Sequence, residues 1–157
     1  MEKSKLYKLY QTLDKKALRK FKKWVCSPIH NEHVFVEELF VFISTRKSYT
    51  TTTLSKKRAW KYICPNKDYN DLRMRHLMSN AYNVLVSFVR YNLSENTKFF
   101  QEKIFANYLF DQKLEKQAHK TLESAANLLR KEVSKESYYY YQYELEVLKL
   151  EETTKQN

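Results

Sequence analysis

The chain has 157 residues, no glycine, two prolines and a formal net charge of +11. Glycine lets a backbone approach phosphate closely and form Asn-Gly hairpin turns, so its absence excludes a Walker loop, a dinucleotide-binding fingerprint and that class of hairpin. The apolar share of 43% excludes a disordered chain, and no apolar run is long enough to predict a membrane span.

Most of the positive charge lies in the front half of the chain. Residues 1–94 contain 19 Lys and Arg against 7 Asp and Glu, whereas residues 95–157 contain 10 against 11. This split predicts an acidic partner for residues 1–94, either nucleic acid, a membrane surface or an acidic protein, although solubility alone explains it equally well. We expect residues 1–157 to form a single helical domain in the cytoplasm, because no signal peptide is visible and two cysteines suit a reducing compartment.

Helical periodicity begins close to the N-terminus. A first short helix is expected to carry Leu6, Tyr7, Leu9, Tyr10 and Leu13. Asp14 can cap a second helix, which Pro28 should end near Cys26. In that second helix the apolar residues recur at helical spacing: Ala17, Leu18, Phe21, Trp24 and Val25. All the remaining positions from 15 to 23 are cationic: Lys15, Lys16, Arg19, Lys20, Lys22 and Lys23.

Residues 34–43 are apolar on almost every side of a helix. They predict a buried central helix capped by Asn31, although their β-branched and aromatic residues leave a strand as the alternative for part of the segment. The run Thr50–Thr53 is expected to form a loop. Ser55 should cap a short helix that ends before Pro65.

The second half of the chain continues the helical pattern. Asn70 is expected to begin a long helix over about 71–93, with an inner face of Leu77, Ala81, Val84, Leu85, Phe88 and Val89. Ser94 should cap the next helix, whose apolar residues are Phe99, Phe100, Ile104, Phe105, Tyr108 and Leu109. After a break near 111–114, a further helix carries Ala118, Leu122, Ala125, Ala126, Leu129 and Val133, and the last helix covers about 136–152. Eight helices with short connections predict an all-α fold of antiparallel pairs, as a helical bundle or a short α-solenoid.

Residues 105–125 resemble one tetratricopeptide unit. The packing residues at matching spacings are Phe105, Ala106, Leu109, Ala118, Leu122 and Ala125. Ala106 replaces the usual turn glycine, and a second full unit is not visible in the sequence. The resemblance therefore implies stacked helix hairpins, not common descent.

The front half is similar to a family of uncharacterised helical proteins of the kind found in Bacteroidetes. The matching segments are Cys26-Ser27-Pro28-Ile29-His30-Asn31 after a basic helix, and Leu72-Arg73-Met74-Arg75-His76-Leu77-Met78-Ser79 after a turn that contains proline. The resemblance assigns no activity and no functional residue. Members often continue into further helices, so it also allows this chain to be a truncated form of a longer helical protein.

The basic helix 15–23 is the first candidate site. Its six cations suit a phosphate backbone or an acidic protein, with counterion release making affinity fall steeply with salt. Other cations would extend this surface if the fold brought them together: Lys56, Lys57, Arg58, Arg73 and Arg75. A more specific form of the nucleic-acid hypothesis is a helix-turn-helix over 55–63 and 71–80, although its turn is long and lacks glycine. The alternative is an ordinary solvated face.

Catalytic and metal-binding patterns are weak in this sequence. Four residues have the ligand types of a zinc site: Cys26, His30, His33 and Cys64. Their spacing is irregular, and both cysteines are expected to pack as small apolar residues. Glu115 and His119 share a helix face, but a solvated surface pair is the commoner meaning. We therefore expect no enzyme, no metal, no cofactor and no small-molecule substrate.

The last predicted helix carries a cluster of tyrosines: Tyr138, Tyr139, Tyr140, Tyr141 and Tyr143. Consecutive helical residues point about 100° apart, so these side chains surround the helix. One face can line the core, and the others predict docking onto a partner, a second copy or further helices, because tyrosine is enriched at interfaces. Packing entirely within the domain is the alternative.

These features predict a non-enzymatic helical protein-interaction module. Its basic front half would bind an acidic partner, and its Tyr-rich last helix would dock or self-associate. The alternative is a nucleic-acid-binding protein that contacts the phosphate backbone through residues 15–23 and 56–75.

Overall fold

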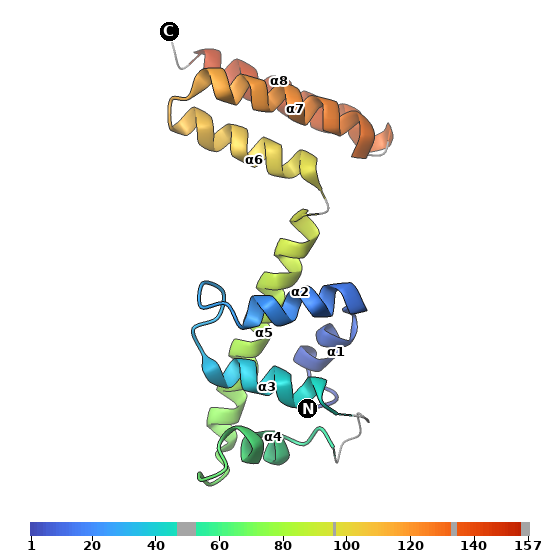
Figure 1. The fold of residues 1–157 in the computed structure, drawn as a ribbon. Coiled ribbons are helices and arrows are strands. Elements are labelled where there is room, and N and C mark those ends of the chain that lie inside the picture. The colour runs from blue at the N-terminus through green and yellow to red at the C-terminus, as the bar shows by residue number, and fades with distance from the viewer. Residues whose placement is uncertain (47–52, 96, 133–134, 155–157) are drawn as a thin grey trace. The chain divides into compact units, whose positions relative to one another are not determined.

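A computed structural model of the chain describes residues 1–46, 53–95, 97–132 and 135–154, and these residues form eight α-helices and no strand (Figure 1). The helices are α1 (Lys5–Gln11), α2 (Lys15–Val25), α3 (Val34–Ser44), α4 (Lys56–Ile63), α5 (Asp71–Glu95), α6 (Lys98–Asp111), α7 (Glu115–Glu132) and α8 (Lys135–Thr154). The predicted all-α fold is confirmed. Within the described ranges, none of the helices has both the length and the apolar composition that crossing a bilayer requires.

The chain divides into two compact units, Met1–Arg90 and Tyr91–Asn157. Each unit has its own hydrophobic core. Whereas the sequence predicted one domain with two differently charged halves, the structure places a separate core in each half. The division falls within α5, close to the point where the charge changes along the chain.

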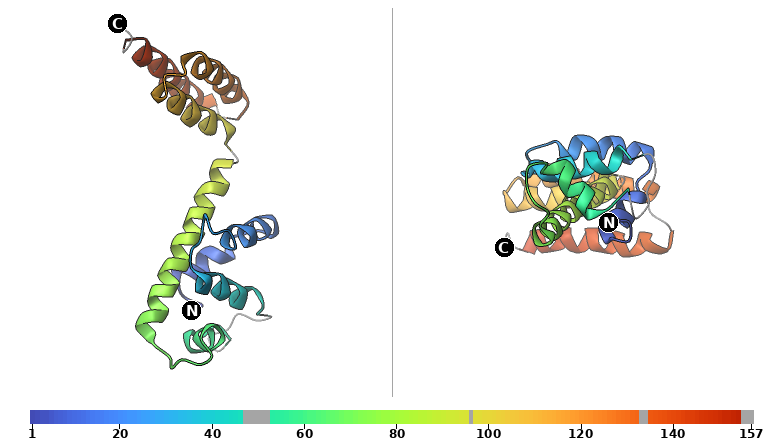
Figure 2. Two further views of the ribbon diagram at one scale, coloured as in Figure 1. Left: turned by 60° about the vertical axis from the view of Figure 1, so that its left-hand side comes forward. Right: turned by 90° about the horizontal axis from the view of Figure 1, so that it is seen from below.

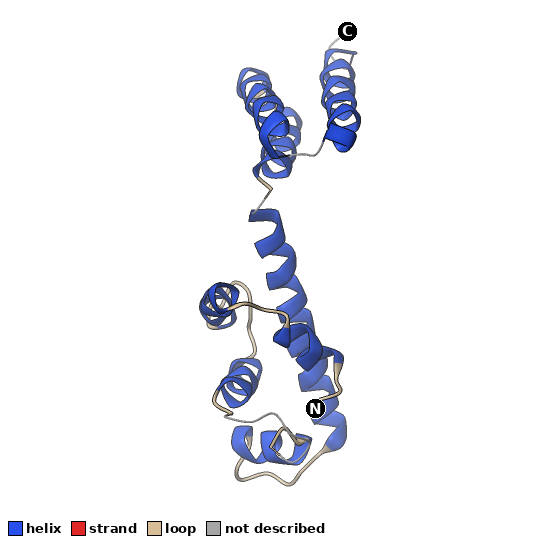
Figure 3. Ribbon diagram, turned by 90° about the vertical axis from the view of Figure 1, so that its right-hand side faces the viewer, coloured by secondary structure: helices blue, strands red, loops and turns tan. Residues whose placement is uncertain are grey.

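In the first unit, aromatic residues join the helices. α2, α3 and α4 lie on the same side of α5 in Figure 3 and in the left view of Figure 2. The ring of Phe21 in α2 lies 4.7 Å from the ring of Phe40 in α3 and 5.1 Å from that of Phe88 in α5, measured between centroids. Tyr10 stacks on Phe40 at 5.9 Å. One aromatic cluster therefore connects α1, α2, α3 and α5.

Three predicted helix caps are confirmed. The Asp14 carboxylate accepts a hydrogen bond from the backbone N–H of Ala17 at 2.7 Å. Ser55 and Asn70 accept in the same way, at 3.2 and 2.9 Å, from the backbone N–H three residues further on. Each bond satisfies a donor that the first turn of a helix leaves unpaired. These side chains set the starts of α2, α4 and α5.

Two predicted caps are wrong. The Asn31 side-chain amide donates to the carbonyls of Val25 and His33, so it closes the loop between α2 and α3, and His33 is the N-cap of α3. Ser94 lies inside α5, where its hydroxyl donates to the Tyr91 carbonyl. In both cases the side chain forms a hydrogen bond with a nearby backbone carbonyl instead of capping the next helix.

The prediction of a fully buried α3 is also wrong, although the segment is a helix and not a strand. Val36, Leu39, Phe40, Phe42 and Ile43 are buried. The remaining apolar side chains are exposed: Val34 by 68%, Phe35 by 48% and Val41 by 37%. Of the loop predicted at 50–53, residues 50–52 lie outside the described part of the chain, and Thr53 begins a turn.

In the second unit, small residues join α6 and α7. These two helices form an antiparallel hairpin in which Ala106, Ala118 and Ala125 are completely buried (Figure 1). The expected apolar face of α6 is partly wrong, because Ile104, Phe105 and Tyr108 are exposed whereas Phe99, Ala106, Leu109 and Phe110 are buried. Val133, predicted for the core, lies outside the described residues.

Candidate functional site: a cationic helix beside an apolar groove

The six cations of α2 form one continuous surface. All six side chains are exposed: Lys15, Lys16, Arg19, Lys20, Lys22 and Lys23. At about 100° per residue they occupy an arc of about 160°, and the apolar residues of the same helix occupy the opposite arc of about 120°. Ala17, Phe21 and Val25 are buried on that opposite arc. We call the cationic arc the α2 cationic face.

An apolar groove runs along one edge of this face, between α2 and α3. Its volume is about 440 Å³. Figure 3 shows α2 and α3 end-on, one above the other on the same side of α5. The aromatic rings of Tyr10, Phe21 and Phe40 form its floor. We call this feature the α2–α3 groove.

The two edges of the groove differ in charge. The α2 edge consists of Leu18, Arg19 and Lys22, so two members of the cationic face also line the groove. The α3 edge includes Val41, one of the apolar residues that the core does not cover. This groove is not predicted by the sequence. Two neighbouring features of the sequence could have indicated it. Residues 34–43 are apolar on more sides than one core contact can bury, and residues 15–23 form a helix with a cationic face.

One end of the groove carries the thiol of Cys26 and the carboxylate of Glu37. The Cys26 thiol donates to the Glu37 carboxylate, with the sulfur 3.2 Å from Oε1. This hydrogen bond, helped by partial burial, raises the pKa of Cys26. The thiol is therefore protonated at neutral pH.

The residues considered for a zinc site have other roles in the structure. The His30 ring stacks on Trp24 at 3.5 Å, and Cys64 is buried in the first core. In the described part of the chain, no three His, Cys, Asp or Glu side chains lie close enough together to hold a metal ion.

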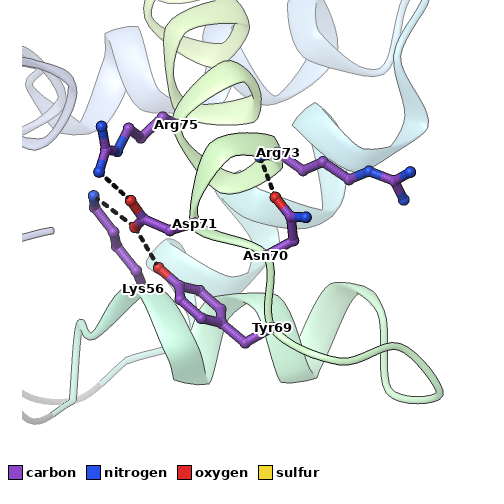
Figure 4. Close-up of polar contacts among 6 residues, drawn as sticks. All are labelled: Lys56, Tyr69, Asn70, Asp71, Arg73 and Arg75. Carbon is purple, nitrogen blue, oxygen red and sulfur yellow. Dashed lines mark hydrogen bonds and ion pairs between the residues drawn. The ribbon is translucent and has the colours of Figure 1, made fainter.

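Lys56 and Arg75 come together at the start of α5, around the carboxylate of Asp71 (Figure 4). Lys56 Nζ lies 3.4 Å from Asp71 Oδ1, and the Arg75 guanidinium forms an ion pair with the other oxygen. The Tyr69 hydroxyl donates to the same carboxylate at 2.7 Å. The hydrogen bonds from Tyr69 and Arg75 lower the pKa of Asp71 to about 2. Two predicted contact residues therefore already bind an anionic side chain.

The remaining predicted cations do not continue the α2 cationic face. Lys57 and Arg58 are exposed on α4, and α3 lies between α2 and α4 in Figures 1 and 3. The Arg73 side chain is exposed and points away from the Asp71 cluster in Figure 4. The structure therefore separates the predicted basic patch into a face on α2 and a smaller group near α4 and the start of α5.

The tyrosines of α8 divide between the core and the surface. Tyr138 and Tyr141 are half-buried, and the Tyr141 ring lies 5.1 Å from the Phe100 ring. Tyr139, Tyr140 and Tyr143 are exposed by 76%, 61% and 68%. Their predicted docking role stays a prediction.

One carboxylate of α8 is tied to α6. Glu144 forms an ion pair with Lys103, and this contact is the main reason that the pKa of Glu144 is lowered. Its hydrogen bond with Tyr140 lowers the pKa of Glu144 further and raises that of the phenol. The Lys103–Glu144 ion pair therefore joins α8 to α6.

His119, which the sequence pairs with Glu115, has a packing role in the structure. Its ring lies edge-on to Phe110, with 5.3 Å between centroids. This contact fixes the imidazole against the turn between α6 and α7.

No protein-family model, curated protein or solved structure matches this chain. The resemblances of residues 105–125 and of the front half therefore stay predictions.

Proposed function

We propose that the protein is a non-enzymatic helical interaction module whose α2 cationic face binds an acidic protein. The observation that carries the proposal is the arrangement of six exposed cations on one arc of a single helix. Such a surface steers an anionic partner and sets its orientation through complementary charge. We place the protein in the cytoplasm, which the two free thiols of Cys26 and Cys64 support.

A protein partner fits this surface better than a nucleic acid does. A phosphate backbone needs cations spread along its path and has little use for an apolar groove beside them. Here the cationic face borders aromatic and aliphatic side chains, whose burial by a protein adds to binding. In addition, Lys56 and Arg75 are neutralised in part by Asp71.

The test compares two variants with equal changes in net charge. In the first, all six cations of α2 become glutamine: Lys15, Lys16, Arg19, Lys20, Lys22 and Lys23. In the matched control, five lysines and one arginine that are exposed in the second unit become glutamine: Lys98, Lys113, Lys116, Lys120, Arg130 and Lys131. Glutamine and lysine have similar helix propensity, so both variants should fold.

Binding is measured by fluorescence anisotropy with labelled polyglutamate and with duplex DNA, between about 50 and 200 mM salt. We expect the wild-type chain and the control to bind polyglutamate with an affinity that falls with salt, and the α2 variant to lose this binding. Equal loss in both variants would show that only net charge matters and would contradict the proposal. Tight binding of DNA without binding of polyglutamate would replace it with the nucleic-acid alternative.

A further inference from the structure

The two sides of the α2 cationic face have different neighbours. Taking Lys15 as the reference, Arg19 and Lys22 lie within about 40° of it, next to Leu18 at the edge of the apolar arc. Both line the α2–α3 groove. Lys16 and Lys23 lie about 80 to 100° around the helix, farther from Leu18 than Arg19 and Lys22 are, and do not line the groove. Of the six cations of α2, Arg19 and Lys22 are therefore the two that line the groove.

The α3 edge of the groove offers few free hydrogen-bond donors. The Ser44 hydroxyl donates to the Val41 carbonyl at 3.0 Å, and the Thr45 hydroxyl lies 3.0 Å from the same oxygen. Val41 itself is aliphatic and partly exposed. A ligand in the groove would thus find charged donors on the α2 edge and apolar surface on the floor and the opposite edge.

This asymmetry matches one kind of ligand. An amphipathic helix presents large apolar side chains along one face and can carry carboxylates along the border of that face. Such a helix places its apolar face on Tyr10, Leu18 and Val41 while its carboxylates reach Arg19 and Lys22. α2 has 11 residues and is about 16 Å long, so three turns of a ligand helix would span the groove.

We infer that the α2–α3 groove binds an amphipathic helical segment of an acidic partner, with its large apolar side chains on Tyr10, Leu18 and Val41, above the buried rings of Phe21 and Phe40, and its carboxylates on Arg19 and Lys22. This inference rests on the proposed function and deepens it, because it names the segment and the subset of cations. The α2 cationic face attracts the partner, and the groove selects the segment that stays bound.

The Cys26–Glu37 pair sets a direction for this ligand. The carboxylate of Glu37 lies at the end of the groove formed by the C-terminal end of α2 and the first turn of α3. It repels acidic side chains at that end, so the carboxylates of the ligand lie toward Arg19. The segment that passes Cys26 is uncharged.

The test uses a labelled peptide of about 16 residues, with leucine and phenylalanine on one helical face and glutamate along the border of that face. A second peptide has the same composition in scrambled order. The variant Arg19→Glu with Lys22→Glu reverses the two groove cations, and the matched control Lys16→Glu with Lys23→Glu reverses two cations outside the groove. All four side chains are exposed, and circular dichroism checks the fold.

We expect the groove variant to weaken binding of the amphipathic peptide by about tenfold or more, and the control to weaken it only a few-fold. The scrambled peptide should bind weakly to every form. Val41→Glu, which adds a carboxylate to the exposed α3 edge, should weaken binding as much as the groove variant does. Equal losses in the two double variants, or equal binding of the two peptides, would overturn the inference and leave the proposed function standing.

Cys26 provides an independent readout of groove occupancy. It is exposed at the end of the groove, whereas Cys64 is buried, so a thiol reagent should modify Cys26 first. We expect the amphipathic peptide to slow modification of Cys26 severalfold, as located by mass spectrometry, and duplex DNA to leave the rate unchanged. Peptide binding without protection of Cys26 would place the ligand elsewhere and overturn the inference. Failure of both peptides and polyglutamate to bind would instead remove the proposed function.

Discussion

Both units of this protein have large and small residues in their cores, but they differ in the side chains that stand out at their helix contacts. In the first unit, Phe21, Phe40 and Phe88 join α2, α3 and α5 through ring contacts. In the second, Ala106, Ala118 and Ala125 lie completely buried in the α6–α7 hairpin. The separation of two packed helices depends on the side chains at their contact, so alanines bring helices together and aromatic rings hold them apart.

This difference explains why the groove occurs where it does. Rings that bridge separated helices fill the centre of the first unit but leave space along its edge, and the α2–α3 groove has Phe21 and Phe40 as its floor. The alanine-rich contact between α6 and α7 instead lets these two helices lie close together. A core of large residues can thus produce a binding surface as a consequence of its packing.

The largest expected effect is the loss of the aromatic cluster. Phe21→Ala should destabilise the first unit by about 3 to 5 kcal/mol, because Phe21 contacts rings from three other segments of that unit. Both tryptophans, Trp24 and Trp60, lie in the first unit, so tryptophan fluorescence during urea unfolding reports that unit alone. The exposed Phe35→Ala, in α3 of the same unit, serves as control and should change stability by less than about 0.5 kcal/mol. A small effect of Phe21→Ala would show that the ring cluster does not hold the unit together.

The second unit should respond in the opposite way, to added volume. Ala118→Leu places a large side chain where α6 and α7 are in close contact and should destabilise the unit by about 1 to 3 kcal/mol. Ser124→Leu, at an exposed position of the same helix, should be nearly neutral. Thermal unfolding followed by circular dichroism measures both. Equal stability of the two variants would contradict the close approach of the two helices.

Loss of a helix cap should have a smaller effect on stability. It distinguishes Asn70, which caps α5 as predicted, from Ser94, which does not cap α6. Asn70→Ala removes the acceptor for the first turn of α5 and should destabilise the first unit by about 1 kcal/mol. Asn70→Ser should retain most of the stability, since serine also caps well. Ser94→Ala, at a position that looks like a cap in the sequence, should change stability little because Ser94 lies within α5. A larger loss at Ser94 than at Asn70 would contradict the assigned helix boundaries.

The smallest effects concern two similar carboxylates, one in each unit. Asp71 and Glu144 each accept from a tyrosine and pair with a cation. The pKa of Asp71 falls from 3.8 to about 2, so its contribution to stability is present above about pH 4 and is lost as the pH falls toward 2. Glu144, with one cation where Asp71 has two, also has a lowered pKa, so its contribution is present above its ordinary value of 4.5 and is lost below it.

Carbon-detected NMR titration of the two carboxylates checks this comparison. Asp71→Asn should remove the part of the acid destabilisation that falls below pH 4, and Lys103→Gln should raise the pKa of Glu144 toward its ordinary value. An Asp71 that titrates at or above 3.8 would show that its partners are not bound in solution.

Local features were predictable from the sequence wherever a single side chain decides them. Asp14, Ser55 and Asn70 cap helices as expected, because a cap needs only one acceptor and the backbone N–H groups beside it. Asn31 and Ser94 have the same chemistry but bind other backbone groups, and the choice between the two partners depends on the path of the chain. The candidate site shows the same limit: the α2 cationic face was predicted, and the groove beside it was not.

The sequence by itself determined the helical fold, the amphipathic division of α2 and the concentration of positive charge in the first unit, because helical periodicity and composition are properties of neighbouring residues. Only the tertiary structure decided which apolar residues of α3 are buried and which face the groove. It also decided that Lys56 and Arg75 meet at Asp71 instead of extending the α2 face. These outcomes depend on which helices lie next to each other, and that follows from the volumes of side chains that are far apart in the chain.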